Sequence, residues 1–268
     1  MSELRIVRMS RYPIKGLSAE PMDSMKLSVG EGVPGDRLHG FARYNSGFDP
    51  QNPEPLPKDR FVVLLNEAGL AGLRTRFHPA SQELEVTTDE GIHRFTMNTP
   101  QGQIDAAQFL SDTLSLRDPA LPQFVSSAPH RFTDVSVVSP KMMNAISVLN
   151  LASVEALGGM LKTEVHPARF RANIEIEGLP AFSELDAVGS SLVFGDVHLR
   201  ILSRTKRCAA TEVNPDTAER DLKIPYLLRK HLGHMDMGIY AEVSVGGTLE
   251  LGQSGRFNKK MSDSDGDE

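Results

Sequence analysis

This sequence has almost no cysteine and lacks tryptophan entirely. Its 268 residues include one cysteine, Cys208, and no tryptophan. A single thiol excludes an intrachain disulfide framework, a cysteine-based zinc finger and an iron–sulfur cluster held by this chain alone. The net charge of −6 at pH 7 argues against a protein that coats nucleic acid, because that function requires a basic surface.

Long apolar runs are absent as well. No stretch reaches the roughly 18 apolar residues of a membrane-spanning helix, so we expect no membrane association. Met1–Ser10 has charged residues among its apolar ones and lacks the apolar segment of a secretory signal. We therefore expect a cytoplasmic protein in a reducing environment. Residues 257–268 contain four acidic side chains and few apolar ones, which predicts a disordered acidic tail.

Short strand-like segments, separated by turns rich in glycine and proline, dominate the sequence. Amphipathic helices are predicted only at Asp105–Leu114, Leu151–Leu161 and Tyr226–Leu232. Regular alternation of strands and helices is missing, as is any G-x-G-x-x-G motif, so a dinucleotide-binding fold is excluded. The pattern favours a mainly β (α+β) protein built on a β-barrel with a few peripheral helices.

The predicted strands fall on both sides of a proline-rich, apolar-poor segment at Asp118–Pro129. This segment marks the expected boundary between one domain at residues 1–122 and another at 123–256. The predicted strands are Leu4–Tyr12, Met25–Val29, Arg37–Tyr44, Arg60–Leu65, a hairpin of Glu83–Thr87 and Ile92–Met97, Ile174–Glu177, Ser191–Phe194, Val197–Ser203 and Ala241–Val245.

The single cysteine lies in an unusual local sequence. Cys208 follows Arg204, Lys206 and Arg207, at the point where a predicted strand passes into a polar loop. Nearby positive charge favours the thiolate, which is the form that attacks electrophiles and binds metals. A tolerated free cysteine explains the same pattern equally well. From the residues alone, both interpretations stay open.

Other cationic residues occur in separate segments. Arg169 and Arg171 would point the same way if their segment is extended, with Asn173 in phase. Such guanidinium groups can grip a phosphate, although a solvated basic strand end is the simpler interpretation. Lys15 is presented between a proline and a glycine, where it can bind phosphate, form a Schiff base or be an ordinary exposed lysine.

Known metal and nucleophile motifs are otherwise missing. His231 and His234 are three residues apart, but no HExxH pattern or third ligand accompanies them, so core or surface histidines are the better interpretation. The sequence has no G-x-S-x-G motif and no phosphate-binding P-loop.

Four motifs in this order resemble the MOSC-domain family with its N-terminal β-barrel domain. They are YPIKG (12–16), PGDR (34–37), FRANI (170–174) and RCAATEVNPDT (207–217), and the resemblance runs from about Arg5 to Gly252. This family includes bacterial members and the mitochondrial amidoxime-reducing component. The resemblance implies an N-terminal domain of the β-barrel type at 1–122 and the MOSC domain at 123–256.

The resemblance also implies a cofactor and the residues that hold it. Family members bind molybdenum cofactor, and the cysteine that matches Cys208 is their catalytic metal ligand. A soft thiolate suits a metal that two dithiolene sulfurs already bind. The residues that match the cofactor-binding positions are Lys15, Arg37, Asn144, Arg171, Asn173, Lys206, Arg207 and Thr211.

Two departures from the family pattern concern the site. Gly16 follows Lys15, where family members often have serine. Family reductases have an acidic and then a small polar residue before the second helix, where this chain has Met142, Met143 and Asn144. The sequence therefore does not identify a carboxylate near the metal.

We expect a molybdenum-dependent oxidoreductase that reduces N-hydroxylated or similar N-oxygenated small molecules. Because one thiol cannot hold an iron–sulfur centre, a separate ferredoxin- or flavin-type protein must donate the electrons. The alternatives are a sulfur carrier that uses a persulfide on Cys208 and a non-catalytic molybdenum cofactor carrier. Family-level descriptions also mention pyridoxal phosphate, but one loop lysine, Lys15, does not make such a pocket.

Overall fold

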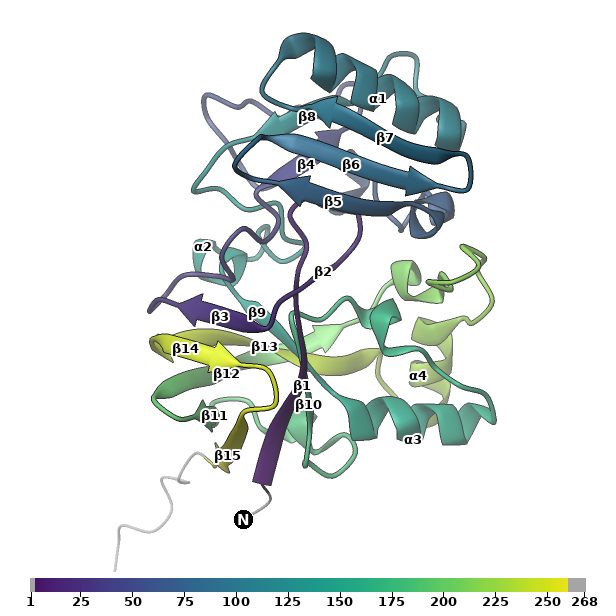
Figure 1. The fold of residues 1–268 in the computed structure, drawn as a ribbon. Helices are drawn as coiled ribbons and strands as arrows, with labels where there is room; N and C mark the ends of the chain where they lie inside the picture. The colour runs from purple at the N-terminus through teal and green to yellow at the C-terminus, as the bar shows by residue number, and fades with distance from the viewer. Residues whose placement is uncertain (1–2, 260–268) are drawn as a thin grey trace, which may run out of the picture.

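A closed barrel forms the lower part of the molecule in Figure 1. The computed structural model describes residues 3–259, and within them seven strands pair in the order β10-β9-β13-β12-β11-β15-β1, with β1 returning to β10. Neighbouring strands are antiparallel except for β9 and β10. The strands are β1 (Glu3–Arg11), β9 (Ile146–Asn150), β10 (Ile174–Glu177), β11 (Ser191–Phe194), β12 (Val197–Lys206), β13 (Asp236–Val245) and β15 (Ser254–Asn258). The predicted mainly β fold with a barrel is confirmed.

Strands from the start of the chain complete this barrel. β1 alternates buried and exposed side chains, and its Leu4 and Ile6 enter the barrel core beside Ile239 and Val243 of β13. Two shorter pairs extend the structure: β2 (Glu20–Pro21) pairs with β1, and β3 (Ser24–Leu27) with β14 (Gly247–Glu250). Strand pairs therefore join residues on both sides of residue 122. The domain boundary expected there stays a prediction.

The upper part of the molecule consists of open sheets and one helix (Figure 1). Within the described residues, its strands form a three-stranded sheet and a two-stranded ladder, whereas the sequence predicted an N-terminal unit of the barrel type. The predicted hairpin is confirmed as β6 and β7. The elements are β4 (His39–Ala42), β5 (Arg74–His78), β6 (Glu83–Thr88), β7 (Gly91–Thr96), α1 (Pro100–Leu114) and β8 (Gln123–Ser126).

Capping residues explain where the helices begin. The predicted start of α1 at Asp105 is wrong, because Thr99 caps the helix by accepting a hydrogen bond from the Gly102 N–H, and a proline occupies the first turn. The predicted range of α3 (Leu151–Leu161) is confirmed, with Asn150 as its cap. The other helices are α2 (Pro140–Met143), α4 (Ile224–Leu232) and the 3-10 turns η1 (Lys58–Arg60), η2 (Ala68–Gly72), η3 (Pro167–Phe170), η4 (Ser183–Asp186) and η5 (Ala209–Glu212).

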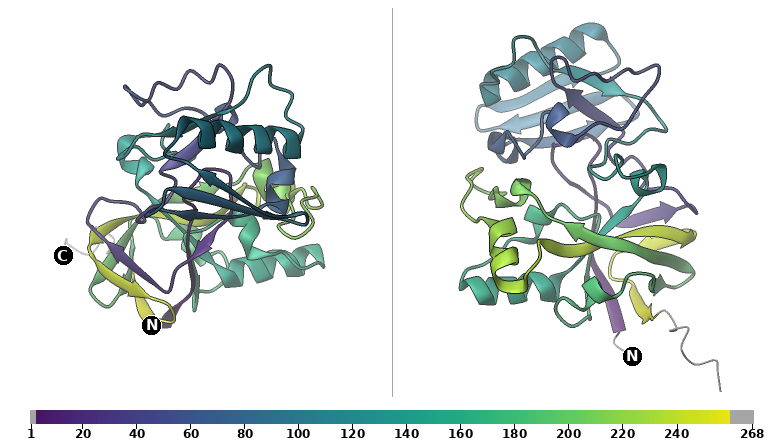
Figure 2. Two further views of the ribbon diagram at one scale, coloured as in Figure 1. Left: turned by 45° about the horizontal axis from the view of Figure 1, so that its top comes forward. Right: turned by 180° about the vertical axis from the view of Figure 1, so that it is seen from behind.

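Helices α3 and α4 pack together on one side of the barrel, as the rear view in Figure 2 shows. None of the helices in residues 3–259 is long and apolar enough to cross a lipid bilayer. At the other end of the chain, β15 extends to Asn258, two residues into the predicted tail, because it pairs with β1 and β11. Residues 260–268 of that predicted tail lie outside the described residues.

Candidate functional site

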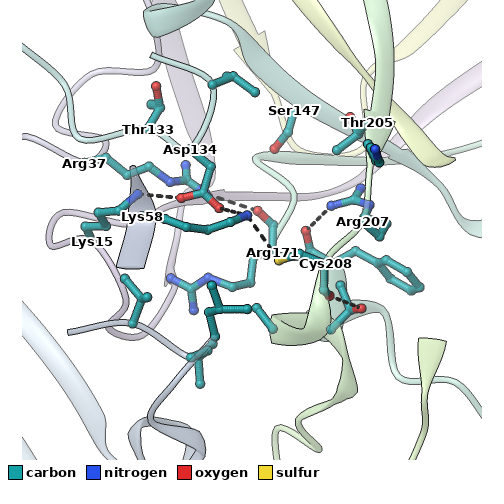
Figure 3. Close-up of a pocket in the computed structure, with 18 of the residues that line it drawn as sticks. Lys15, Arg37, Lys58, Thr133, Asp134, Ser147, Arg171, Thr205, Arg207 and Cys208 are labelled. Carbon is teal, nitrogen blue, oxygen red and sulfur yellow. Dashed lines mark hydrogen bonds and ion pairs between the residues drawn. The ribbon is translucent and has the colours of Figure 1, made fainter. Parts of the chain in front are cut away.

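A pocket of about 250 Å³ opens where the barrel meets the upper sheets (Figure 3). Barrel residues form one wall, and residues 63–65, which pack in the upper core, form part of the other. Of the predicted site residues, Asn144 is the one that does not line this pocket. Its amide donates to the Gly30 carbonyl at 3.1 Å. The eight predicted residues that line the pocket are Lys15, Arg37, Arg171, Asn173, Lys206, Arg207, Cys208 and Thr211.

The turn that carries Cys208 is held by Thr211. β12 ends at Lys206, and Cys208 has extended backbone angles before η5 begins. The Thr211 N–H and hydroxyl both donate to the Cys208 carbonyl, at 3.0 and 2.8 Å. The thiol is half-buried and faces the pocket. Thr211 therefore fixes the orientation of the thiol through the backbone.

Arg207 lies beside the thiol with its guanidinium buried. Its Nε and Nη1 donate to the carbonyls of Met237 and Phe170, at 2.7 and 2.9 Å, and the group lies over the Phe170 ring. Its Nη2 is buried and has no hydrogen-bond partner within the described residues. Burial lowers the pKa of Arg207, but a guanidinium stays charged. An unpartnered donor nitrogen on a buried cation is costly unless a ligand accepts its hydrogen bond.

Tyr12 lies between two further guanidinium groups of the pocket. The Arg37 and Arg171 groups are 4.6 and 4.3 Å from the centre of its ring. Asp36 also contributes, because it accepts from the Tyr12 N–H at 2.7 Å and pairs with Arg37. The ring attracts both cations through its face, so Tyr12 stabilises two like charges close together.

Asn173 acts within the protein and not as a free amide. Its Oδ1 accepts from the backbone N–H and the hydroxyl of Ser147, at 3.2 and 3.1 Å. Its Nδ2 donates to the Ser10 carbonyl and to Asp36, at 3.2 and 3.1 Å. Both ends of the amide are therefore engaged, and the side chain fastens β1 and β9 beside the pocket.

The segment of Arg169 and Arg171 is not extended, so the condition under which the two side chains would point the same way is not met. Residues 167–170 form η3, which begins at a proline, and Arg171 ends this turn with φ of 50°. Arg169 is 5% exposed and turns toward Asp221 and the Glu212 carbonyl, at 2.7 and 3.1 Å. Both arginines line the pocket, Arg169 from within η3 and Arg171 from the residue that directly follows it.

Asp134 supplies the carboxylate that the sequence did not identify. It lies eight residues before Met142, in the neighbourhood of which family reductases have an acidic residue. The Lys15 ammonium contacts one Asp134 oxygen at 2.5 Å, and the Lys58 ammonium contacts the other at 3.1 Å. Burial alone would raise the pKa of Asp134, but the two ammonium groups outweigh it and hold that pKa well below its usual range.

Lys58 connects this ion pair to the thiol. Its Nζ lies 3.2 Å from the Cys208 Sγ, as the dashed line in Figure 3 shows. Burial alone would lower the pKa of Lys58, but the charges of Asp134 and Cys208 raise it. Sequence analysis missed this residue because its segment is distant along the chain and belongs to none of the recognised motifs.

Gly16 has a backbone conformation and a close backbone contact that a serine would not tolerate. Its φ is +88°, and a Cβ there would lie 2.5 Å from the Val62 carbonyl oxygen. A Cβ cannot approach so closely without movement of the backbone, so glycine lets residues 62–65 pass beside Lys15. The same packing explains why the predicted strand at Arg60–Leu65 is not formed: Phe61 makes one bridge with Ala42, and the chain then turns into the pocket wall.

The chemical character of the pocket is cationic and rich in donors. Of its lining residues within the described chain, seven are lysine or arginine and one, Asp134, is acidic. Besides Arg207 Nη2, the Arg169 Nε and the Thr205 hydroxyl are buried without hydrogen-bond partners among residues 3–259. Such a pocket fits an anionic ligand that offers several acceptors and a metal that accepts a thiolate.

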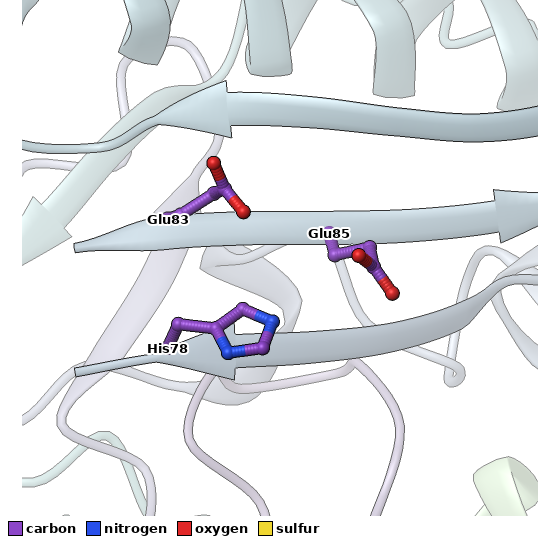
Figure 4. Close-up of side chains that lie close together, drawn as sticks. All are labelled: His78, Glu83 and Glu85. Carbon is purple, nitrogen blue, oxygen red and sulfur yellow. The ribbon is translucent and has the colours of Figure 1, made fainter. Parts of the chain in front are cut away.

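A second cluster lies away from this pocket. Among the described residues, one group of three possible metal ligands occurs, on β5 and β6: His78, Glu83 and Glu85 (Figure 4). Arg94 pairs with Glu85 at 2.8 Å and lies 3.6 Å from Glu83. This cation compensates the two carboxylates, so the cluster does not require a metal. His231 and His234 are not part of any such group within residues 3–259.

Part of the chain is similar to known proteins. Residues 129–254 match the MOSC domain. Mitochondrial amidoxime-reducing component 1 of Mus musculus is 33% identical over 129 residues, which are 45% of this chain and 37% of the mouse protein. Molybdenum cofactor sulfurase of Caenorhabditis elegans is 32% identical over 118 residues, or 41% of this chain and 16% of the nematode protein. The chain thus matches well under half the length of these relatives.

One solved structure aligns along nearly the whole chain. The YuaD protein of Bacillus subtilis covers 97% of both chains, with 14% identity and a TM-score of 0.46.

Proposed function

We propose that this chain, whose residues 129–254 match the MOSC domain, binds molybdenum cofactor and acts as an oxidoreductase. The observation that carries the proposal is the surroundings of Cys208. The only thiol of the chain faces a cationic pocket in which buried donor atoms lack partners among the described residues. An anionic cofactor whose metal takes a thiolate ligand satisfies both features.

The residues divide into those that would contact the cofactor and those that position them. Arg207 Nη2, Arg169 Nε and the Thr205 hydroxyl are the buried pocket donors without partners among residues 3–259, and Arg171 and Lys206 add positive charge at the pocket. Thr211, Tyr12 and Asn173 hold Cys208, the two guanidinium groups and β1 in place. When bound, the cofactor supplies two-electron redox chemistry at molybdenum, with Cys208 as the protein ligand.

Asp134 and its two lysines would complete the site beside the thiol. The carboxylate is ionised at neutral pH because Lys15 and Lys58 hold it in that form. It can therefore accept a hydrogen bond from a substrate, while the lysines keep it oriented. Half-burial of the thiol leaves one side of Cys208 open to a small molecule.

We further propose that the substrate is an N-hydroxylated or similar N-oxygenated compound. The support is the match to the amidoxime-reducing component, whose name states that activity. A separate protein, of ferredoxin or flavin type, would donate the electrons, since the one cysteine of this chain cannot hold an iron–sulfur cluster.

Sulfur transfer is the second candidate, and the match to a molybdenum cofactor sulfurase favours it. In that case Cys208 would carry a persulfide, and the Lys58 ammonium beside the sulfur would stabilise its negative charge. The two candidates differ in metal content, because a persulfide carrier retains no molybdenum.

The test is the molybdenum and pterin content of protein from a host that makes the cofactor. We expect both in the native chain and loss of molybdenum from Cys208→Ala, with an unchanged circular dichroism spectrum. Equal molybdenum in the two proteins would contradict the assignment of Cys208. Reduction of benzamidoxime with an artificial electron donor then separates an enzyme from a carrier.

A further inference from the structure

Lys58 enters the pocket from a segment that belongs to neither the barrel nor the cationic motifs. Residues 49–59 contain four prolines, and Pro57 directly precedes η1, in which Lys58 is the first residue. Prolines restrict the backbone, so this segment presents its lysine with less conformational freedom than an ordinary loop. The side chain is 29% exposed and points to the thiol (Figure 3).

The contacts of Lys58 leave positive charge beside the sulfur. Lys15 and Lys58 share the single carboxylate of Asp134, so two ammonium groups face one negative charge. Lys15 is 4% exposed and also donates to the Phe132 carbonyl at 2.9 Å. Lys58 is the one of the two that also reaches Cys208, at 3.2 Å from Nζ to Sγ. A molecule that approaches the sulfur therefore meets this ammonium group.

Independent observations show that the same space suits an acceptor-rich ligand. Arg207 Nη2 and the Thr205 hydroxyl are buried and unpartnered within the described residues, and both side chains line this pocket. The Lys58 ammonium group cannot accept a hydrogen bond from either donor. The two donors and the ammonium group are therefore all available to a ligand.

We propose that Lys58 makes the open side of Cys208 selective for anions, so that the substrate carries a negative charge near its reactive group. This inference rests on the proposed function for the identity of the reaction, and it names the class of substrate: a small N-oxygenated compound that bears a carboxylate or another anionic group. Lys58 binds the anionic group of the substrate and takes no part in electron transfer.

Alkylation of cofactor-free protein tests the anion preference without any metal. Because Cys208 is the only thiol, iodoacetate and iodoacetamide label that residue alone. The Cys208 thiolate attacks both reagents and displaces iodide, so the ratio of the two rates cancels the degree of ionisation and reports the local charge. We expect Lys58→Met to lower the ratio of iodoacetate to iodoacetamide about threefold to tenfold, and added salt to lower the ratio of the native protein.

Matched variants make the alkylation result specific. Lys58→Arg keeps the charge and should keep most of the ratio, whereas Lys26→Met removes an exposed lysine on β3 and should leave it unchanged. Lys58→Gln repeats the test in case Lys58→Met does not fold by circular dichroism. If the ratio stays at the native value in folded Lys58→Met or Lys58→Gln, the proposed anion site is wrong.

A second measurement addresses the substrate. With molybdenum-loaded protein and an artificial donor, we expect benzamidoxime bearing a carboxylate to have a higher kcat/KM than benzamidoxime, and Lys58→Met to remove that preference. No preference in the native protein would overturn the substrate class. Absence of molybdenum together with the expected alkylation ratios would refute the proposed function and leave the anion site standing.

Discussion

Replacement of Gly16 by alanine should strain the pocket wall beside Lys15. Gly16 has φ of +88°, and an added Cβ would lie 2.5 Å from the Val62 carbonyl oxygen and 3.2 Å from the Val63 Cα. Both contacts are to backbone atoms, so relief requires movement of residues 62 and 63, which adjoin the pocket wall. The variant should therefore weaken both the fold and the position of Lys15.

The magnitude follows from separate contributions. A side chain in this left-handed region costs about 1–2 kcal/mol, and the backbone clash adds about 1–3 kcal/mol. Alanine regains about 0.4–1 kcal/mol by restricting the unfolded chain. We expect a net loss of about 3 kcal/mol in the free energy of unfolding for Gly16→Ala, which urea denaturation followed by circular dichroism can measure.

Gly47 offers a matched control. Its φ is +82°, and an added Cβ would meet no atom within 4 Å. Gly47→Ala therefore carries the conformational cost without the clash, and we expect a loss of about 1 kcal/mol or less. If Gly16→Ala destabilises the protein no more than Gly47→Ala does, the close approach of the Val62 carbonyl does not require glycine at position 16.

Three other predictions concern charged groups and their contacts. Tyr12→Leu should lower both the free energy of unfolding, by about 2 kcal/mol, and molybdenum retention, because it removes the ring between two guanidinium groups, whereas Tyr12→Phe should keep most of both. Burial raises the pKa of Glu184, so the folded state holds its proton more tightly than the unfolded state and stability should fall as pH rises above about 4.5; Glu184→Gln should lack that slope in urea denaturation across pH. The low pKa of Asp134 predicts the opposite sign: its stabilisation is complete above about pH 4 and is lost in stronger acid. Asp134→Asn should therefore be less stable than the native protein at pH 7 and lose less of its stability in acid. We expect a difference in the free energy of unfolding of only about 1 kcal/mol at pH 7, because the carboxylate is partly exposed and solvent screens its ion pairs. Equal pH profiles of variant and native protein would contradict either assignment.

Local patterns predicted the parts of the structure that depend on near neighbours. The alternation of apolar residues in β1 and the capping Asn150 of α3 act within a few residues, so the strand and the helix were found with nearly correct limits. The order of the four motifs likewise predicted that Cys208, Lys15 and Arg171 would share one pocket. Their contact with a cofactor stays a prediction.

Features that depend on distant contacts could not be predicted. Asp134 and Lys58 lie 76 residues apart, and the fold alone brings them together and places Lys58 beside Cys208. No periodicity or spacing marks such a pair. Asn173 looks like a free binding amide in the sequence, yet its hydrogen-bonding groups are engaged by Ser10, Asp36 and Ser147, which come from remote segments.

The pairing of β1 with β15 has a consequence for how the protein is made. β1 closes the barrel by contacting β10 and β15, so the first described strand must wait for one of the last. During synthesis on the ribosome, about 250 residues emerge before Glu3 can meet Arg256. Until then β1 and β11 each expose an unpaired edge, which invites aggregation and calls for protection by chaperones. A chain that stops before Ser254 cannot close the barrel, so the barrel forms only when nearly the whole described chain has been made.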